Sequence, residues 1–340
     1  MEAERMMAKQ YDHSIAVDWS QRNMAIAVLR KDAEKPRVMD VPTSVSELKV
    51  FLRSLKGSKI LTLEESSTSQ WLYTELRESV DQLIICDPYR NRLLQDGPKN
   101  DKIDAEKLVV LLRSGLLKEV FHSGSEYFHL RKLVSSYNDI VRSMVRFKNQ
   151  RAAVCIAQGK SRKCGSEEIR SESFSLEALD ALINVHEDRL EKFAAEFKRL
   201  RRTNKLIQAL VTIPGIKEKS AVKLLATVID PGRFPDKGHW LSYCGLVRLE
   251  KKSGGKSYGT RKSRYSRSAK SIFKTAAMVC IGLGREDNVF RKYYNRLKDR
   301  GLPEHNARHA VARRIAVVAL GILKTGLAFE NRWEKKEAEK

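Results

Sequence analysis

The first third of the chain alternates short apolar runs with segments of helical spacing. Runs rich in apolar residues predict five strands: Ser14–Val17, Met24–Leu29, Arg37–Val41, Lys59–Leu63 and Gln82–Cys86. Two further segments have helical spacing, Val45–Leu55 and Thr68–Val80. Strands alternating with helices indicate an α/β layer architecture. The hairpin at the start of this order is typical of a ribonuclease-H-like fold.

The strongest periodic pattern lies in the middle of the chain. Its seam positions step by three and four residues as in a heptad repeat: Leu176, Leu179, Ile183, His186, Leu190, Phe193, Phe197 and Leu200. A basic segment with helical spacing, Tyr127–Lys160, precedes it, and Gly159–Gly165 predicts a flexible break. The heptad fits either a coiled coil joining two protomers or a long antiparallel helix pair within one chain.

Charge narrows the class of partner. The 340 residues include 65 Lys and Arg against 42 Asp and Glu, a formal net charge of +23. This excess is typical of proteins that bind nucleic-acid phosphates, although a membrane surface would attract it too. The longest apolar runs, such as Ile315–Leu323, fall far short of the roughly 20 residues of a membrane span, and Met1–Gln10 is charged. We therefore expect a cytoplasmic protein without a membrane partner.

Cysteine and histidine spacing indicates neither a zinc site nor a disulfide framework. The cysteines are odd in number and form no Cys-x-x-Cys pair, so we expect reduced, buried residues at Cys86, Cys155, Cys164, Cys244 and Cys280. His305 and His309 share a helix face at i and i+4 but lack the intervening glutamate and third ligand of a zinc helix. Metal binding by this pair is not expected.

Four acidic residues at the ends of predicted elements contrast with the basic background. Asp18 ends the first strand and Glu64 follows the fourth. Asp101 and Asp104, three residues apart, lie in the first turn of a helix with Asn100 or Asp101 as N-cap, so both carboxylates can face one site. Acids grouped at strand ends would repel nucleic-acid phosphates unless divalent cations lay between them. The pattern therefore predicts a metal-dependent nucleic-acid enzyme.

The segment from Lys251 to Lys270 contains eight Lys or Arg and no acidic residue. With interleaved tyrosines and hydroxyls, the run favours contact with a phosphate backbone. The cations assigned to nucleic-acid binding are Lys251, Lys252, Lys256, Arg261, Lys262, Arg264 and Arg267, with Lys217 farther upstream. Ser253 lies in a Gly-rich turn of this run, where nearby lysines favour a nucleophilic alkoxide. Tyr258 and Tyr265 are alternative nucleophiles outside such a turn.

Pro214-Gly215 predicts a tight turn before a helix at Ser220–Thr227. One interpretation is a helix-hairpin-helix element whose backbone N–H groups bind a phosphate. The other is ordinary turn chemistry without a ligand. Both remain open from the residues alone.

The order of these motifs resembles that of the insertion-sequence-one-ten family of transposases, the DEDD recombinases related to the Piv invertase. The resemblance runs from about Ser14 to Gly326 and rests on Asp-Trp-Ser, Leu-Glu-Glu-Ser-Ser, Pro-Lys-Asn-Asp-Lys-Ile-Asp-Ala, the heptad region, Ile-Pro-Gly-Ile, Tyr-Cys-Gly-Leu-Val and Lys-Ser-Gly-Gly-Lys. It implies a RuvC-like domain whose four acids, Asp18, Glu64, Asp101 and Asp104, bind Mg²⁺ or Mn²⁺. It also implies that Ser253 becomes covalently linked to DNA, and that a bridge RNA pairs with donor and target DNA.

Two departures from the family pattern affect the site. The family has Glu-x-Thr-Gly after the strand, whereas this chain continues from Glu64 with Glu65-Ser66-Ser67-Thr68. Glu65 is therefore an alternative ligand, and Glu64 is favoured because it directly follows the apolar Leu63. Lys217 replaces the second glycine of Pro-Gly-Ile-Gly, which adds a cation where the family pattern implies a backbone contact.

These patterns together predict four regions and one function. The regions are an α/β RuvC-like domain at 11–125, a helical coiled-coil region at 126–205, a mostly α-helical transposase domain at 206–328 and a charged tail at 329–340. We expect a prokaryotic transposase, associated with the nucleoid when active, that cuts and rejoins DNA as a dimer or tetramer. Its rivals are a hydrolytic nuclease of the junction-resolvase type and a non-catalytic nucleic-acid-binding scaffold.

Overall fold

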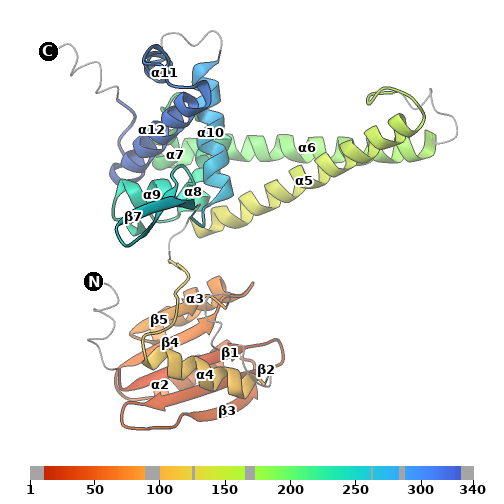
Figure 1. The fold of residues 1–340 in the computed structure, drawn as a ribbon. Coiled ribbons are helices and arrows are strands. Elements are labelled where there is room, and N and C mark those ends of the chain that lie inside the picture. Colours follow the sequence, from red (N-terminus) through yellow and green to blue (C-terminus); the bar gives the residue numbers. More distant parts are fainter. Residues whose placement is uncertain are drawn as a thin grey trace. The chain divides into compact units, whose positions relative to one another are not determined.

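The computed structural model describes residues 11–88, 100–124, 127–164, 173–261, 263–282 and 288–330. The chain divides into two compact units, residues 1–124 and 125–340 (Figure 1). The predicted tail at 329–340 lies outside the described residues except for its first two positions. None of the described helices is long and apolar enough to cross a membrane.

The first unit contains one mixed five-stranded sheet, with all five predicted strands confirmed. The strands are β1 (His13–Trp19), β2 (Asn23–Arg30), β3 (Arg37–Pro42), β4 (Lys59–Glu64) and β5 (Gln82–Cys86). Their order across the sheet is β3-β2-β1-β4-β5. The pairs β1–β2 and β2–β3 are antiparallel, whereas β1–β4 and β4–β5 are parallel. This mixed α/β arrangement confirms the predicted architecture of the first domain.

Helices pack on both faces of the sheet. They are α2 (Val45–Ser54), α3 (Ser69–Leu76) with the 3₁₀ turn η1 (Arg77–Ser79), and α4 (Asp101–Arg113). Ile15 and Val17 of β1 belong to the core shared with α2 and α3, while Ala16 between them belongs to the core shared with α4. Strand side chains alternate between faces, so the sequence of each strand assigns its residues to one of two cores.

The core beneath α4 is built from small residues. Ala16, Ala25 and Ala27 of the sheet meet Ala105 of the helix, and all four are buried. Small side chains let helix and sheet approach closely, which brings the first turn of α4 near the sheet. The Asn100 side chain accepts a hydrogen bond from the Lys102 backbone N–H at 3.1 Å, which identifies the N-cap of α4.

The second unit begins with two long helices, α5 (Phe128–Ala157) and α6 (Ser173–Thr203), which run antiparallel (Figure 1). Their contacts run in opposite directions along the chain: Tyr137 contacts Phe197, Phe147 contacts His186, and Arg151 pairs with Asp180. All eight heptad positions of α6 are buried or half-buried. The seam therefore packs within one chain, and a coiled coil joining two protomers is not confirmed.

The expectation that all cysteines are reduced is wrong for one pair. Cys155 near the end of α5 and Cys164 form a disulfide, with Cα atoms 5.9 Å apart. The chain turns back after α5 through a hydrogen bond from Lys160 N–H to the Cys155 carbonyl, and Arg151 donates to the Cys164 carbonyl at 2.9 Å. These local contacts could not be foreseen from an odd cysteine count. Cys86, Cys244 and Cys280 are reduced and buried, as expected.

The rest of the second unit is mostly helical around one core that also includes parts of α5 and α6. Its elements are α7 (Lys205–Val211), α8 (Glu218–Val228), η5 (Pro231–Arg233), α9 (Lys237–Tyr243), the hairpin β6 (Leu249–Ser253) and β7 (Lys256–Arg261), α10 (Arg267–Ile281), α11 (Val289–Asp299) and α12 (Glu304–Thr325). Trp240 of α9 is fully buried and its indole N–H donates to the Ala316 carbonyl of α12 at 2.7 Å. This bond fixes α9 against α12.

The seam of α6 provides a direct test of the helix pair. We expect Phe197→Ala to lower the free energy of unfolding by about 3 kcal/mol, because a buried phenyl ring leaves a cavity. Phe197 is 1% exposed, whereas Phe174 on the same helix is 82% exposed. Urea unfolding followed by circular dichroism measures both variants. Equal losses for Phe197→Ala and Phe174→Ala would contradict the packing described.

Candidate functional site

Asp18 and Glu64 lie on the face of the sheet that α4 covers. Asp18 follows Ala16 by two residues on β1, and Glu64 follows Ile60 by four residues on β4, so each shares the face of a residue in the α4 core. The parallel register pairs Val17 with Leu63, one residue before each acid. The two carboxylates therefore stand on neighbouring strands at the same edge of the sheet.

Asp101 and Asp104 approach the same place from the first turn of α4. Burial and, in decreasing order of size, the negative charges of Asp101, Glu64 and Asp104 together raise the pKa of Asp18 to about 6. The part of this rise that comes from like charges requires those charges to lie near the Asp18 carboxylate. The structure therefore brings together all four acids that the sequence singled out.

Carboxylates that ligate a metal ion must lie closer together than carboxylates that only affect one another's pKa. Among the described residues, no three His, Cys, Asp or Glu side chains already have a metal-ligating arrangement. The two observations concern different distances, because charges interact over about 8–10 Å in salt whereas Mg²⁺ or Ca²⁺ ligands lie roughly 2.0–2.6 Å from the ion. The donor set fits a hard divalent cation, since carboxylate oxygens are the ligands that Mg²⁺ and Mn²⁺ prefer.

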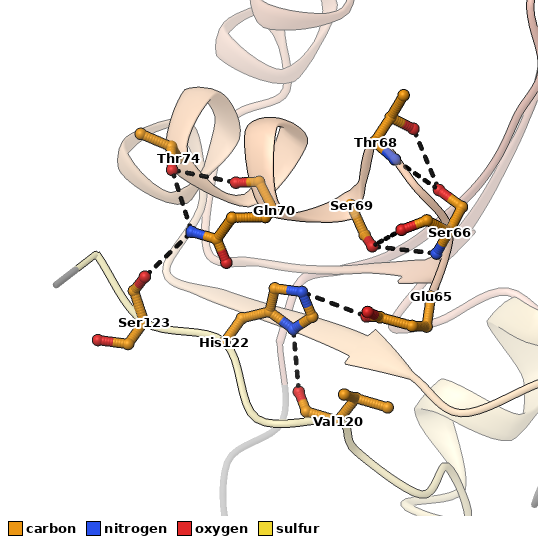
Figure 2. Close-up of polar contacts among 9 residues, drawn as sticks. All are labelled: Glu65, Ser66, Thr68, Ser69, Gln70, Thr74, Val120, His122 and Ser123. Carbon is orange, nitrogen blue, oxygen red and sulfur yellow. Dashed lines mark hydrogen bonds and ion pairs between the residues drawn. The ribbon is translucent and has the colours of Figure 1, made fainter. Parts of the chain in front are cut away.

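Glu65 forms an ion pair with a residue that is not one of the acids around Asp18. Figure 2 shows its carboxylate beside the His122 ring, with Oε2 3.2 Å from Nε2. His122 Nδ1 lies 3.3 Å from the Val120 carbonyl, and the side chain is only 4% exposed. The Tyr73 ring contacts the His122 ring, with centroids 5.6 Å apart. These contacts separate Glu65 from Glu64, whose charge acts on Asp18.

Sequence reasoning missed His122, because an isolated histidine in a short irregular segment has no distinguishing pattern. Its position depends on a contact between distant segments. Val120 N–H donates to the Ile85 carbonyl at 2.7 Å, and Glu119 forms a bridge with Cys86. The segment before residue 124 is thereby attached to β5, which places His122 next to the end of β4.

Hydroxyl groups shape the turn after β4 where the family pattern has glycine. Ser69 Oγ donates to the Ser66 carbonyl at 2.7 Å and accepts from the Ser66 N–H at 3.0 Å (Figure 2). The side-chain amide of Gln70, the next residue, donates a hydrogen bond to the Ser123 carbonyl at 3.1 Å. The departure from Glu-x-Thr-Gly is therefore compensated by side-chain hydrogen bonds that define the turn.

Ser253 is the last residue of β6, not part of an irregular loop. Gly254 and Gly255 form a two-residue turn with φ of 54° and 77°, and Ser253 pairs with Lys256 across it. Positive φ at both positions is the geometry of a type I′ hairpin turn and explains the two glycines. Every residue of β6 and β7 is exposed. The Ser253 hydroxyl is accordingly accessible from solvent.

The predicted nucleic-acid-binding cations have exposed positions in the second unit. Lys251, Lys252, Lys256 and Arg261 lie on the hairpin, Arg264 and Arg267 precede or begin α10, and Lys217 is at the N-cap position of α8. Lys262 lies outside the described residues. The tyrosines differ: Tyr258 on β7 is 65% exposed, whereas the Tyr265 ring is covered by Lys270, whose Nζ lies 4.3 Å from its centre. Tyr265 is therefore the less accessible nucleophile.

The Pro214-Gly215 turn has a packing role in this structure. Gly215 has φ of +85°, and a side chain there would bring a Cβ within 2.5 Å of the Ala276 carbonyl on α10. Glu218 in the first turn of α8 accepts a hydrogen bond from its own N–H and pairs with Arg201. An acid therefore already occupies the helix N-terminus, where a phosphate would bind.

Comparison with known proteins gives two family matches. Residues 15–157 match a transposase family model, and residues 207–295 match the model of the transposase IS116/IS110/IS902 family. The acids fall within the first match and Ser253 within the second. The two matches thus cover both parts of the candidate site.

Individual relatives are similar over part of the chain. An "Insertion element IS110 uncharacterized 43.6 kDa protein" from Streptomyces coelicolor is 31% identical over 45% of this chain and 37% of its own length. Pilin gene-inverting proteins of Moraxella lacunata and Moraxella bovis are each 27% identical over 36% of this chain and 38% of their own length. The chain thus spans under two fifths of the curated relatives it matches.

The raised pKa of Asp18 predicts a stabilising substitution. Its pKa of about 6 in the folded protein exceeds its ordinary value of 3.8, so stability falls as pH rises between these values. We expect Asp18→Asn, in chelator, to raise the thermal unfolding temperature at about pH 7.5 and to have no such effect below about pH 4.

Asp12 is the matched control with the opposite sign. Hydrogen bonds from the Ser58 backbone and hydroxyl lower the pKa of Asp12. Asp12→Asn should therefore lower the unfolding temperature near neutral pH and lose this effect in acid. If both substitutions shift the unfolding temperature in the same direction at neutral pH, loss of charge repulsion does not explain the effect of Asp18→Asn.

Proposed function

Because the chain belongs to the IS116/IS110/IS902 transposase family, we propose that it is a DNA transposase that cuts and rejoins the strands of an insertion sequence. The observation that carries this proposal is the electrostatic coupling of Asp18 to Glu64, Asp101 and Asp104. Perturbed carboxylates grouped in one place are characteristic of catalytic sites. The second support is the exposed serine on a basic hairpin in the other unit.

The four acids have the role of holding Mg²⁺ or Mn²⁺. When bound, such an ion neutralises charge on the scissile phosphate and on the attacking and leaving oxygens. Asp18 and Glu64 would hold it from the sheet, and Asp101 and Asp104 from α4. Burial of Asp18 strengthens its need for a cation, because an unpaired buried carboxylate is unfavourable.

Ser253 has the role of nucleophile. Its Oγ attacks the scissile phosphorus and forms an ester bond, while the bond to the 3′ oxygen of the cut strand breaks and that oxygen takes up a proton. The 3′ hydroxyl of the recipient strand then attacks the same phosphorus and releases the serine hydroxyl. One phosphoester bond is exchanged for another at each step, so the reaction needs no external energy source.

The nucleic acid is held by cations of the second unit. The exposed lysines and arginines of the hairpin suit donor and target DNA backbones, whose phosphates attract such groups without regard to sequence. Sequence recognition would come from a bridge RNA paired with the DNA, as in other RNA-guided systems. The four acids belong to the first unit and Ser253 belongs to the second.

A covalent adduct tests the serine mechanism. We expect wild-type protein with element-junction DNA, the flanking noncoding RNA and Mg²⁺ to yield a protein–DNA adduct on a denaturing gel. Ser253→Ala should abolish it because the nucleophile is absent, and Asp104→Ala should reduce it at least about a hundredfold because metal ligation is impaired. Tyr258→Phe is the control that retains the adduct. Cleavage that survives Ser253→Ala would instead establish a water-using nuclease.

The two adjacent glutamates can be separated by metal dependence. We expect Glu64→Gln to abolish Mg²⁺-dependent cleavage, because it removes one of the charges coupled to Asp18. Glu65→Gln should keep cleavage within about tenfold of wild type, since the Glu65 carboxylate pairs with His122. Titration of activity with Mg²⁺ compares the two. The reverse order of effects would assign Glu65 as the ligand.

A further inference from the structure

A cavity of about 780 Å³ lies in the second unit beside α9, α10 and α12. Its charged and aromatic lining consists of Arg248, Tyr265, Lys270, His305, His309 and Arg313. No acidic residue is among the described residues that line it. The volume falls within the roughly 300–1,000 Å³ that is usual for sites of small ligands. None of its cations lies on the basic hairpin.

Two helix faces supply most of this positive charge. His305, His309 and Arg313 recur every four residues and so share one face of α12. On α10, Lys270 lines the cavity, and a second hollow of about 380 Å³ adds Arg267 and Lys274. Tyr265 and Lys270 line both hollows, which makes them one continuous basic surface.

The cations are close enough to affect one another. Burial lowers the pKa of His309, and the charges of Lys274, Arg313, Lys270 and His305 lower it further. Positive groups held together in this way repel each other, and an anion in the cavity would relieve the repulsion. The His305 and His309 pair therefore lies in surroundings that favour an anion over a metal cation.

Backbone contacts give this cavity a defined wall. The Ser266 N–H donates to the Tyr243 carbonyl at 2.8 Å, and Ser263 Oγ donates to the Ser242 carbonyl at 3.0 Å. These bonds join the start of α10 to the end of α9. Gly245 then allows Tyr265 to pack, because a Cβ there would lie 2.6 Å from the tyrosine ring. Gly245, Leu246 and Val247 of the Tyr-Cys-Gly-Leu-Val motif thus form part of the cavity lining.

We propose that this cavity is a phosphate-binding pocket that holds a backbone phosphodiester of the nucleic acid on which the chain acts. The proposal rests on the proposed function only in requiring that the chain bind nucleic acid. Arg313, Lys270 and Arg248 contact the phosphate oxygens, and the neutral walls of Leu246, Val247 and Leu302 surround the attached sugar. DNA and RNA share this phosphodiester chemistry.

Binding of fluorescently labelled single-stranded oligonucleotides, without divalent ions, tests the pocket in the full chain. We expect Arg313→Gln to weaken binding roughly fivefold and to reduce the slope of log affinity against log salt by about 0.7, the value for one lost phosphate contact. Arg146→Gln is the matched control, because Arg146 is exposed on α5 and outside the cavity. Equal losses for both variants would overturn the proposal.

Histidine substitution gives a second, independent measurement. His309 faces Lys270 and Lys274 of α10 and His305 and Arg313 of α12, with Arg248 and Tyr265 also lining the cavity. Burial and the surrounding positive charges lower the pKa of His309 below its ordinary value. A phosphate favours the protonated form of His309, so wild-type affinity should rise severalfold as pH falls from about 8 to about 5. A rise that persists in the double variant His305→Gln, His309→Gln would refute the pocket.

Two arms of the experiment separate its possible outcomes. Oligonucleotides of the same sequence in DNA and RNA show which nucleic acid the pocket prefers. A loss of affinity in Arg313→Gln for either oligonucleotide supports the pocket. Binding through the pocket without formation of a serine adduct would overturn the proposed function alone. The pocket alone would be overturned if the wild type forms the adduct and Arg313→Gln binds the oligonucleotides as tightly as the wild type.

Discussion

The alternation of side chains along β1 and β4 is the constraint on which the first unit depends. Ile15, Val17 and Leu63 fill the core beneath α2 and α3, and this leaves the residues between and after them on the opposite face. Asp18 and Glu64 consequently face α4. A shift of one residue in either strand would move an acid to the wrong face and bury polar groups in the core beneath α2 and α3.

The same arrangement carries an electrostatic cost. Four carboxylates converge on one place, and the pKa of Asp18 rises to about 6 because burial and repulsion both disfavour its charge. Other contacts compensate for this repulsion and hold the acids in place. Alanines beneath α4 allow close packing, Asn100 caps the helix, and the His122–Glu65 pair secures the end of β4. Active sites commonly retain local destabilisation that the surrounding fold offsets.

The second unit presents its cations in two ways. On the hairpin they are exposed on strands that belong to no hydrophobic cluster, an arrangement of low local stability that lets a segment adjust to a partner. In the cavity, by contrast, helices fixed by Trp240 and by the Ser266 bond hold the cations in place. A fixed group of cations loses less entropy on binding a phosphate than mobile side chains do. The cavity thus holds its cations in fixed positions, whereas the hairpin lets its cations adjust to a partner.

The sequence alone determined the local features of this protein. Strand and helix periods located the five strands and the heptad of α6, because burial patterns follow the geometry of each element. Carboxylates at strand ends and in the first turn of α4 were visible for the same reason. The tertiary structure decided what depends on contacts between distant segments. It paired Glu65 with His122, closed the Cys155–Cys164 disulfide, turned the α6 seam toward α5 and gathered His309 with the cations of α10. Such contacts follow from the packing of whole elements, which no local period encodes.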